Sequence, residues 1–156
     1  MALVLESPSF RHGQPIPRAH ALDHGNVSPA LRWHGEPDGT KSFLLVVEDP
    51  DAPDPEAPKR TWVHWIVYDL PAGAHALEED ASRAGLPDGA GQGLNDWDDP
   101  AWDGPKPPVG RHRYFFKLWA LDRALPHRAY HRADLAKMID GHVLDYAELV
   151  GTFARH

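Results

Sequence analysis

Three short apolar runs, each closed by turn-forming residues, constrain the fold of this chain more than any other feature. They cover residues 43–47, 62–70 and 114–121 and are rich in β-branched and aromatic side chains. Runs of this length bounded by Pro, Gly and Asp predict strands that are buried on both faces, or nearly so. Residues 3–5 are expected to form an edge strand, and residues 28–33 lead into a turn at Pro37-Asp38-Gly39.

The periodicity changes near the C-terminus. Residues 133–139 carry apolar side chains at helical spacing and end at Asp140-Gly141, a typical helix stop. Residues 143–153 also fit one face of a helix, through Val143, Leu144, Tyr146, Ala147, Val150 and Phe153. The residue pattern therefore predicts a mainly β protein, a sandwich with a C-terminal helical region.

The segment 81–110 interrupts this pattern with many Pro and Gly residues and no periodicity. A loop of that length inside a compact domain usually has a functional reason.

Length and composition narrow the classes of protein. The 156 residues fit a single domain, residues 1–156, and the absence of cysteine excludes disulfides, thiolate nucleophiles and Cys-based zinc sites. No segment approaches the ~20 apolar residues of a membrane-spanning helix, and the N-terminus lacks the basic region of a signal peptide. We therefore expect a cytoplasmic protein without membrane insertion. A net charge of −7 with no basic stripe argues against nucleic-acid binding.

Several catalytic motifs are missing from the sequence. It has neither a G-x-S-x-G nucleophile elbow nor an H-E-x-x-H zinc motif. The segment 35–42, GEPDGTKS, only approximates a phosphate-binding loop, because Thr40 stands where that loop requires Lys.

What remains is a set of ionisable side chains beside the predicted strands. Asp49 and Asp51 are two residues apart, so an extended backbone points both carboxylates the same way. The same alternation predicts two further groups that share a strand face: His64 with Trp62, Ile66 and Tyr68, and His112 with Tyr114.

These segments resemble the phosphatidylethanolamine-binding proteins, a family that includes the Raf kinase inhibitor proteins and plant flowering-time regulators. The resemblance rests on Asp-Pro-Asp-Ala-Pro at 49–53, Trp-x-His at 62–64, Gly-Pro-Lys-Pro-Pro at 104–108 and His-Arg-Tyr at 112–114. It covers nearly the whole chain and is greatest for the bacterial branch. Lys106 departs from it, because bacterial members often carry Cys in that segment, and this leaves rim shape and ligand choice open.

The resemblance implies a sandwich of two antiparallel sheets and a small pocket for phosphate-like anions at one end, with no cofactor. The ligand-binding residues it implies are Asp49, Asp51, His64, His112 and Tyr114, with Trp62 as a nearby aromatic and Gly104, Pro105, Pro107 and Pro108 on the rim.

Such residues suit an oxyanion. Two imidazoles offer N–H groups, Tyr114 offers a phenolic O–H, and backbone N–H groups near Gly104 add donors. A carboxylate would either accept a hydrogen bond from a His nitrogen or take the proton of a phosphate monoanion. Both arrangements predict that anion binding strengthens from about pH 8 to about pH 5.5.

The sequence thus predicts a non-catalytic binding or regulatory protein for a phosphorylated head group or phosphopeptide. The resemblance adds a kinase or a protease as a candidate protein partner. Two alternatives remain: a metal-dependent hydrolase with zinc or manganese held by Asp49, Asp51, His64 and His112, and a purely structural role as a homodimer. The two carboxylates could also simply cap a turn.

Overall fold

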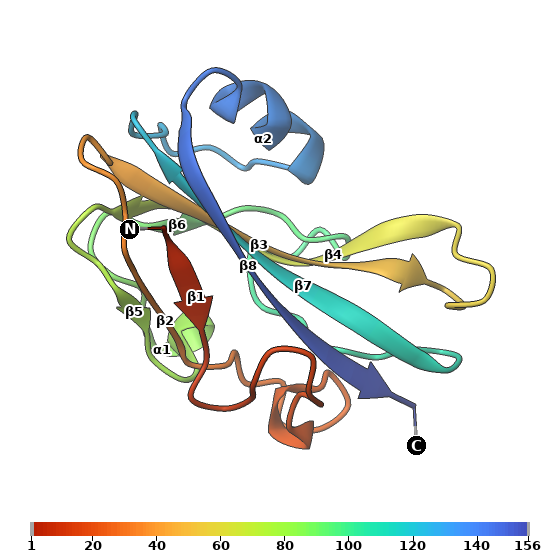
Figure 1. Ribbon diagram of the computed structural model, residues 1–156. Coiled ribbons are helices and arrows are strands. Elements are labelled where there is room, and N and C mark those ends of the chain that lie inside the picture. Colours follow the sequence, from red (N-terminus) through yellow and green to blue (C-terminus); the bar gives the residue numbers. More distant parts are fainter. Residues whose placement is uncertain (1, 156) are drawn as a thin grey trace.

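The protein is described here by a computed structural model that covers residues 2–155. It contains two antiparallel sheets, which confirms the expected mainly β architecture (Figure 1). The smaller sheet has the order β1-β2-β5, formed by β1 (Val4–Glu6), β2 (Leu31–His34) and β5 (Ala76–Leu77). The larger has the order β6-β4-β3-β7-β8, formed by β3 (Ser42–Ala52), β4 (Arg60–Pro71), β6 (Gly91–Gln92), β7 (Arg111–Leu121) and β8 (Val143–Ala154).

Alternating side chains on β3 explain why the large sheet is buried on both faces. Phe43, Leu45 and Val47 belong to the core shared with the small sheet. Leu44 and Val46 belong to a second core, which includes residues of α2 (Arg132–Ile139). Figure 1 shows α2 and the small sheet on opposite sides of the long strands. A continuous apolar run is what a strand with two covered faces requires.

The predicted helix over residues 143–153 is wrong, because these residues form β8. The buried residues of β8 alternate, at Ala147, Leu149, Gly151 and Phe153. Gly151 hides this alternation in the sequence: it is buried because Ile16 and Phe10 pack on it, and a Cβ there would lie 2.5 Å from Ile16. The C-terminal helical region consists of α2 alone within the described residues.

The segment 81–110 is mostly irregular, as expected, apart from α1 (Ala81–Ala84) and the two-residue β6. The N-terminal segment between β1 and β2 is also irregular and contains the 3-10 helix η1 (Arg18–His20). No helix within residues 2–155 has the length and apolar character needed to cross a membrane.

Candidate functional site

A cavity of about 230 Å³ lies at one end of the large sheet. It is built where β3 ends and where β4 and β7 begin, and β3 lies between the other two strands in the sheet. Residues from distant parts of the chain therefore meet there. The lining residues are Asp49, Ala52, Pro53, Trp62, His64, Trp97, Lys106, Pro107, Pro108, His112 and Tyr114.

An irregularity in β4 turns His64 into this cavity. Val47 pairs with Trp65 and Glu48 pairs with Val63, so His64 is an extra residue opposite the β3 strand. A bulge of this kind re-aims a side chain and breaks strict alternation. The expectation that His64 shares a face with Ile66 and Tyr68 is therefore wrong, since those two residues pack in the core beneath α2.

The hydrogen bonds of His64 fix its tautomer. Its Nδ1 lies 2.6 Å from the carbonyl oxygen of Asp103, which can only accept, so Nδ1 carries the proton. Burial lowers the pKa of His64, against the opposing effects of that carbonyl and of Asp49. The ring is thus neutral near pH 7, and Nε2 presents a lone pair with no protein partner within residues 2–155.

His112 is arranged differently, because both of its ring nitrogens are already bonded. Nδ1 lies 2.5 Å from Oδ2 of Asp49, and Nε2 lies 2.8 Å from the carbonyl oxygen of Val109. The carbonyl requires a proton on Nε2, and a second proton lies between Nδ1 and the carboxylate. The His112–Asp49 pair is therefore neutral as a unit and buried. The expectation that His112 donates a hydrogen bond to a ligand does not fit this geometry.

Tyr114 supplies the second polar group that a ligand could use. Its ring centroid lies 5.2 Å from that of His64, and its hydroxyl has no hydrogen-bond partner within residues 2–155. Burial, and then the nearby Asp49 and Asp51, raise the pKa of Tyr114 well above its usual value. The phenol therefore keeps its proton and can donate it in a hydrogen bond.

Asp51 does not line the cavity, although the sequence placed it beside Asp49. The pairing of β3 with β4 is irregular between Asp49 and Ala52, and the Asp51 carboxylate instead accepts hydrogen bonds from the backbone and guanidinium of Arg113, at 2.9–3.0 Å. Those bonds lower the pKa of Asp51. Its backbone N–H donates to Oδ1 of Asp49 at 2.7 Å, so Asp51 supports the site from outside.

Two of the four expected rim residues are also displaced from the cavity. The backbone N–H of Gly104 donates to Oδ1 of Asn26 at 2.8 Å, so it is not free for an anion. A Cβ at Gly104 would lie 1.8 Å from the carbonyl oxygen of His20, and only glycine permits this approach. Pro105 lines a neighbouring cavity, whereas Pro107 and Pro108 line both.

Two important wall residues, Trp97 and Lys106, were not among the expected ligand-binding residues. Trp97 packs edge-on against Trp62 and His64, with ring centroids 5.2 and 5.3 Å apart. It comes from the segment 81–110, whose length was the one available indication that it contributes to a site. Lys106 stands out in the sequence only as a departure from the family pattern.

The ligand set of the alternative hydrolase is not assembled. Asp51 is bonded to Arg113, and both nitrogens of His112 are engaged. Within residues 2–155, no three His, Asp or Glu side chains converge as metal ligands would. The donor geometry therefore does not fit a zinc or manganese site at these residues.

Comparison with known proteins agrees with this fold. The family model described as phosphatidylethanolamine-binding protein matches residues 6–154. A UPF0098 protein of Methanothermobacter thermautotrophicus is 40% identical over 153 residues, which cover 97% of this chain and 98% of the relative.

Two solved structures are similar over nearly their whole length. The putative phosphatidylethanolamine-binding protein homologue CT736 of Chlamydia trachomatis has a TM-score of 0.89 at 36% identity and covers 99% of each chain. Escherichia coli YbcL, described as a new member of the mammalian PEBP family, has a TM-score of 0.90 at 33% identity and covers 100% of each chain. The shared fold, the extent of the matches and the ordered motifs lead to one assignment: this chain belongs to the phosphatidylethanolamine-binding protein family.

Proposed function

We propose that this chain is a non-covalent binding protein whose cavity holds a phosphate-like anion, such as the phosphate of a head group or of a phosphorylated side chain. The observation that supports it most is that Nε2 of His64 and the hydroxyl of Tyr114 lie on neighbouring rings of the same cavity. Both polar groups belong to lining residues of one cavity and have no hydrogen-bond partner within residues 2–155. The indole N–H of Trp62, a third lining residue, is buried and also has no hydrogen-bond partner among the described residues. A polar group at a cavity wall without a protein partner is a hydrogen-bonding site that a ligand can fill.

The protonation states of His64 and Tyr114 favour a phosphate that carries one proton. Nε2 of His64 accepts a hydrogen bond, and Tyr114 donates one. A phosphate monoester with one P–OH proton matches both, because it donates through P–OH to His64 and accepts through a charged oxygen from Tyr114. A dianion would have to take up a proton on binding, with the same net result. Asp49 does not repel the ligand as a bare carboxylate would, because His112 neutralises it.

The remaining walls are suited to the substituent of the phosphate. The rings of Trp62, Trp97, Pro53 and Pro107 line the same cavity and add apolar surface to its walls. A cavity of about 230 Å³ accommodates a head group or one side chain and is too small for the acyl chains of a lipid. A kinase or protease could be engaged through a phosphorylated side chain seated there, and such regulation would need no catalysis by this chain.

Isothermal titration with phosphoethanolamine at several pH values tests the proposal. Affinity should rise by a factor on the order of tens from pH 8 to pH 5.5, because the second pKa of a phosphate monoester is about 6 and only its monoanion matches the site. Tyr114→Phe should weaken binding by about tenfold, the equivalent of one hydrogen bond to a charged group. Tyr130→Phe, which removes a hydroxyl bonded to the Pro126 carbonyl, is the matched control. No binding at any pH, or binding that is independent of pH, would sink the proposal.

A further inference from the structure

The anion cavity contains no free positive charge from the residues first expected to bind. His112 is neutralised by Asp49, and burial keeps His64 neutral near pH 7. An oxyanion still carries charge into a mostly apolar cavity, and such a transfer is costly without a compensating cation. Lys106 is the one Lys or Arg among the described lining residues.

Lys106 stands between two cavities. It lines the anion cavity and also a neighbouring cavity of about 310 Å³, whose wall includes Asp23, His24 and Arg155. In the second cavity its ammonium group lies 3.3 Å from Oδ1 of Asp23. Both side chains are more than half exposed, at 57% and 64%. An ion pair so exposed contributes little to stability, so Lys106 can leave Asp23 at small cost.

The backbone on either side of Lys106 is held in place, which leaves its side chain as the part that can move. Pro105 and Pro107 are buried, and the carbonyl of Pro105 accepts a hydrogen bond from the N–H of Leu22 at 3.1 Å. The carbonyl of Pro108 accepts one from Arg155 at 2.9 Å. A lysine side chain has a four-carbon stem and freely rotating donors, so it can point to either cavity from one fixed attachment point.

We propose that Lys106 is a ligand-binding residue of this chain that exchanges Asp23 for the bound anion. In the empty protein its ammonium group pairs with Asp23, and in the complex it pairs with the anion. Asp23 then acts as an internal competitor that weakens anion binding. This inference rests on the proposed function, because it assumes that the cavity takes an anion.

The exchange predicts opposite effects for two residues that touch each other. Lys106→Gln removes the cation and should weaken phosphoethanolamine binding by about tenfold, the range expected for a charged hydrogen bond. Asp23→Asn frees the lysine and should strengthen binding by about two- to fivefold, the equivalent of a surface ion pair. In the double variant Asp23→Asn should have no further effect, because its influence passes through Lys106.

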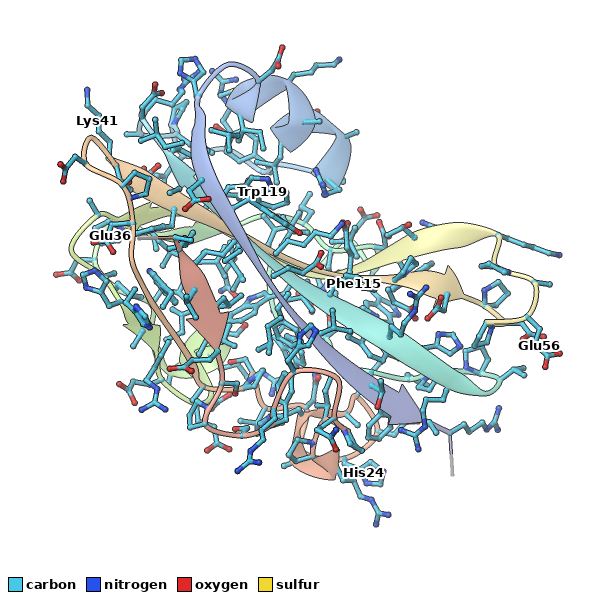
Figure 2. The ribbon with its side chains drawn as sticks, viewed as in Figure 1. His24, Glu36, Lys41, Glu56, Phe115 and Trp119 are labelled. Atoms are coloured by element: carbon cyan, nitrogen blue, oxygen red, sulfur yellow. The ribbon has the colours of Figure 1, made fainter. Side chains whose placement is uncertain are left out.

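Titration calorimetry at constant pH and ionic strength measures all four proteins. Lys41→Gln and Asp38→Asn are matched controls for the change in net charge. Lys41 lies at the opposite end of the long strands from Glu56 (Figure 2). Glu56 belongs to the loop between β3 and β4, which contributes Pro53 to the wall of the anion cavity. Both controls should bind as the unmodified protein does. Equal affinity of Lys106→Gln and the unmodified protein would overturn the exchange while leaving the proposed function intact. Weaker binding by Asp23→Asn would overturn it as well, since it would make Asp23 a support of the site. No binding by the unmodified protein would instead refute the proposed function itself.

Discussion

The two histidines of the site differ because of what each ring nitrogen touches, although they are identical as letters in the sequence. His112 has an acceptor at both nitrogens and is closed to ligands. His64 has an acceptor at one nitrogen only, and its other nitrogen is available. The sequence could place both rings beside the strands. It could not predict their partners, because His112 and His64 are bonded to the backbone carbonyls of Val109 and Asp103, and every residue type has such a carbonyl.

Burial of His64 in neutral form gives a stability prediction. Its pKa is lowered in the folded protein, so the unfolded chain binds more protons there as the pH falls. The associated stability is fully present above about pH 6.5, the value for an unperturbed His, and is lost as the pH falls below it. In His64→Gln, the free energy of unfolding should therefore change less between pH 7.5 and pH 5 than in the unmodified protein.

Urea unfolding at each pH measures this difference. His34→Gln, which removes an exposed imidazole on β2, is the control and should keep the slope of the unmodified protein. An identical slope in His64→Gln and the unmodified protein would show that His64 does not carry this dependence.

At the scale of elements, the loop before the rim depends on the amide of one buried residue. Oδ1 of Asn95 accepts hydrogen bonds from the N–H groups of Trp97 and Asp99, at 2.9 and 3.1 Å. Its Nδ2 donates to the carbonyl of Ala101 and to the carboxylate of Asp103, both at 2.9 Å. The amide thus holds the wall residue Trp97 and the residue whose carbonyl orients His64.

Asn95→Ala should destabilise the protein by about 2–4 kcal/mol, because it leaves several buried polar groups without partners. It should also weaken phosphoethanolamine binding, since the Trp97 wall loses its support. Urea unfolding and calorimetry measure the two effects. Asp88→Ala, at an exposed position of the same segment, is the control for a substitution that removes no buried bond. Unchanged stability would contradict the stabilising role of Asn95, and unchanged phosphoethanolamine binding would contradict its role in supporting Trp97.

The sequence predicts the elements well where burial follows one simple period. The runs at 43–47, 62–70 and 114–121 lie in β3, β4 and β7 as expected. It fails at β8, where Gly151 occupies a buried position but adds no apolar side chain to the alternation in the sequence. It also fails at His64 and Asp51, because irregular pairing is decided by the partner strand and not by the strand's own residues.

At the scale of the whole molecule, both cores share the large sheet, so the two halves of the sandwich have no independent interior. The single domain predicted from length should therefore unfold in one cooperative transition, with equal calorimetric and van't Hoff enthalpies. Phosphoethanolamine at 100 times its Kd should add about 2.7 kcal/mol to the free energy of unfolding and raise the Tm. Differential scanning calorimetry with and without ligand measures both. Two separate transitions, or a Tm that does not change with ligand, would contradict the prediction.

The homodimer stays a prediction that sedimentation can test.

The close approach of Gly104 to His20 has a consequence for how the cavity forms. The segment that leads into the rim is joined to the N-terminal part of the fold, because the indole N–H of Trp102 donates to the carbonyl of His20, 82 positions away along the sequence. Contacts between such distant segments form only when the chain has folded as a whole. Capture of the anion would therefore report that this long-range packing is in place.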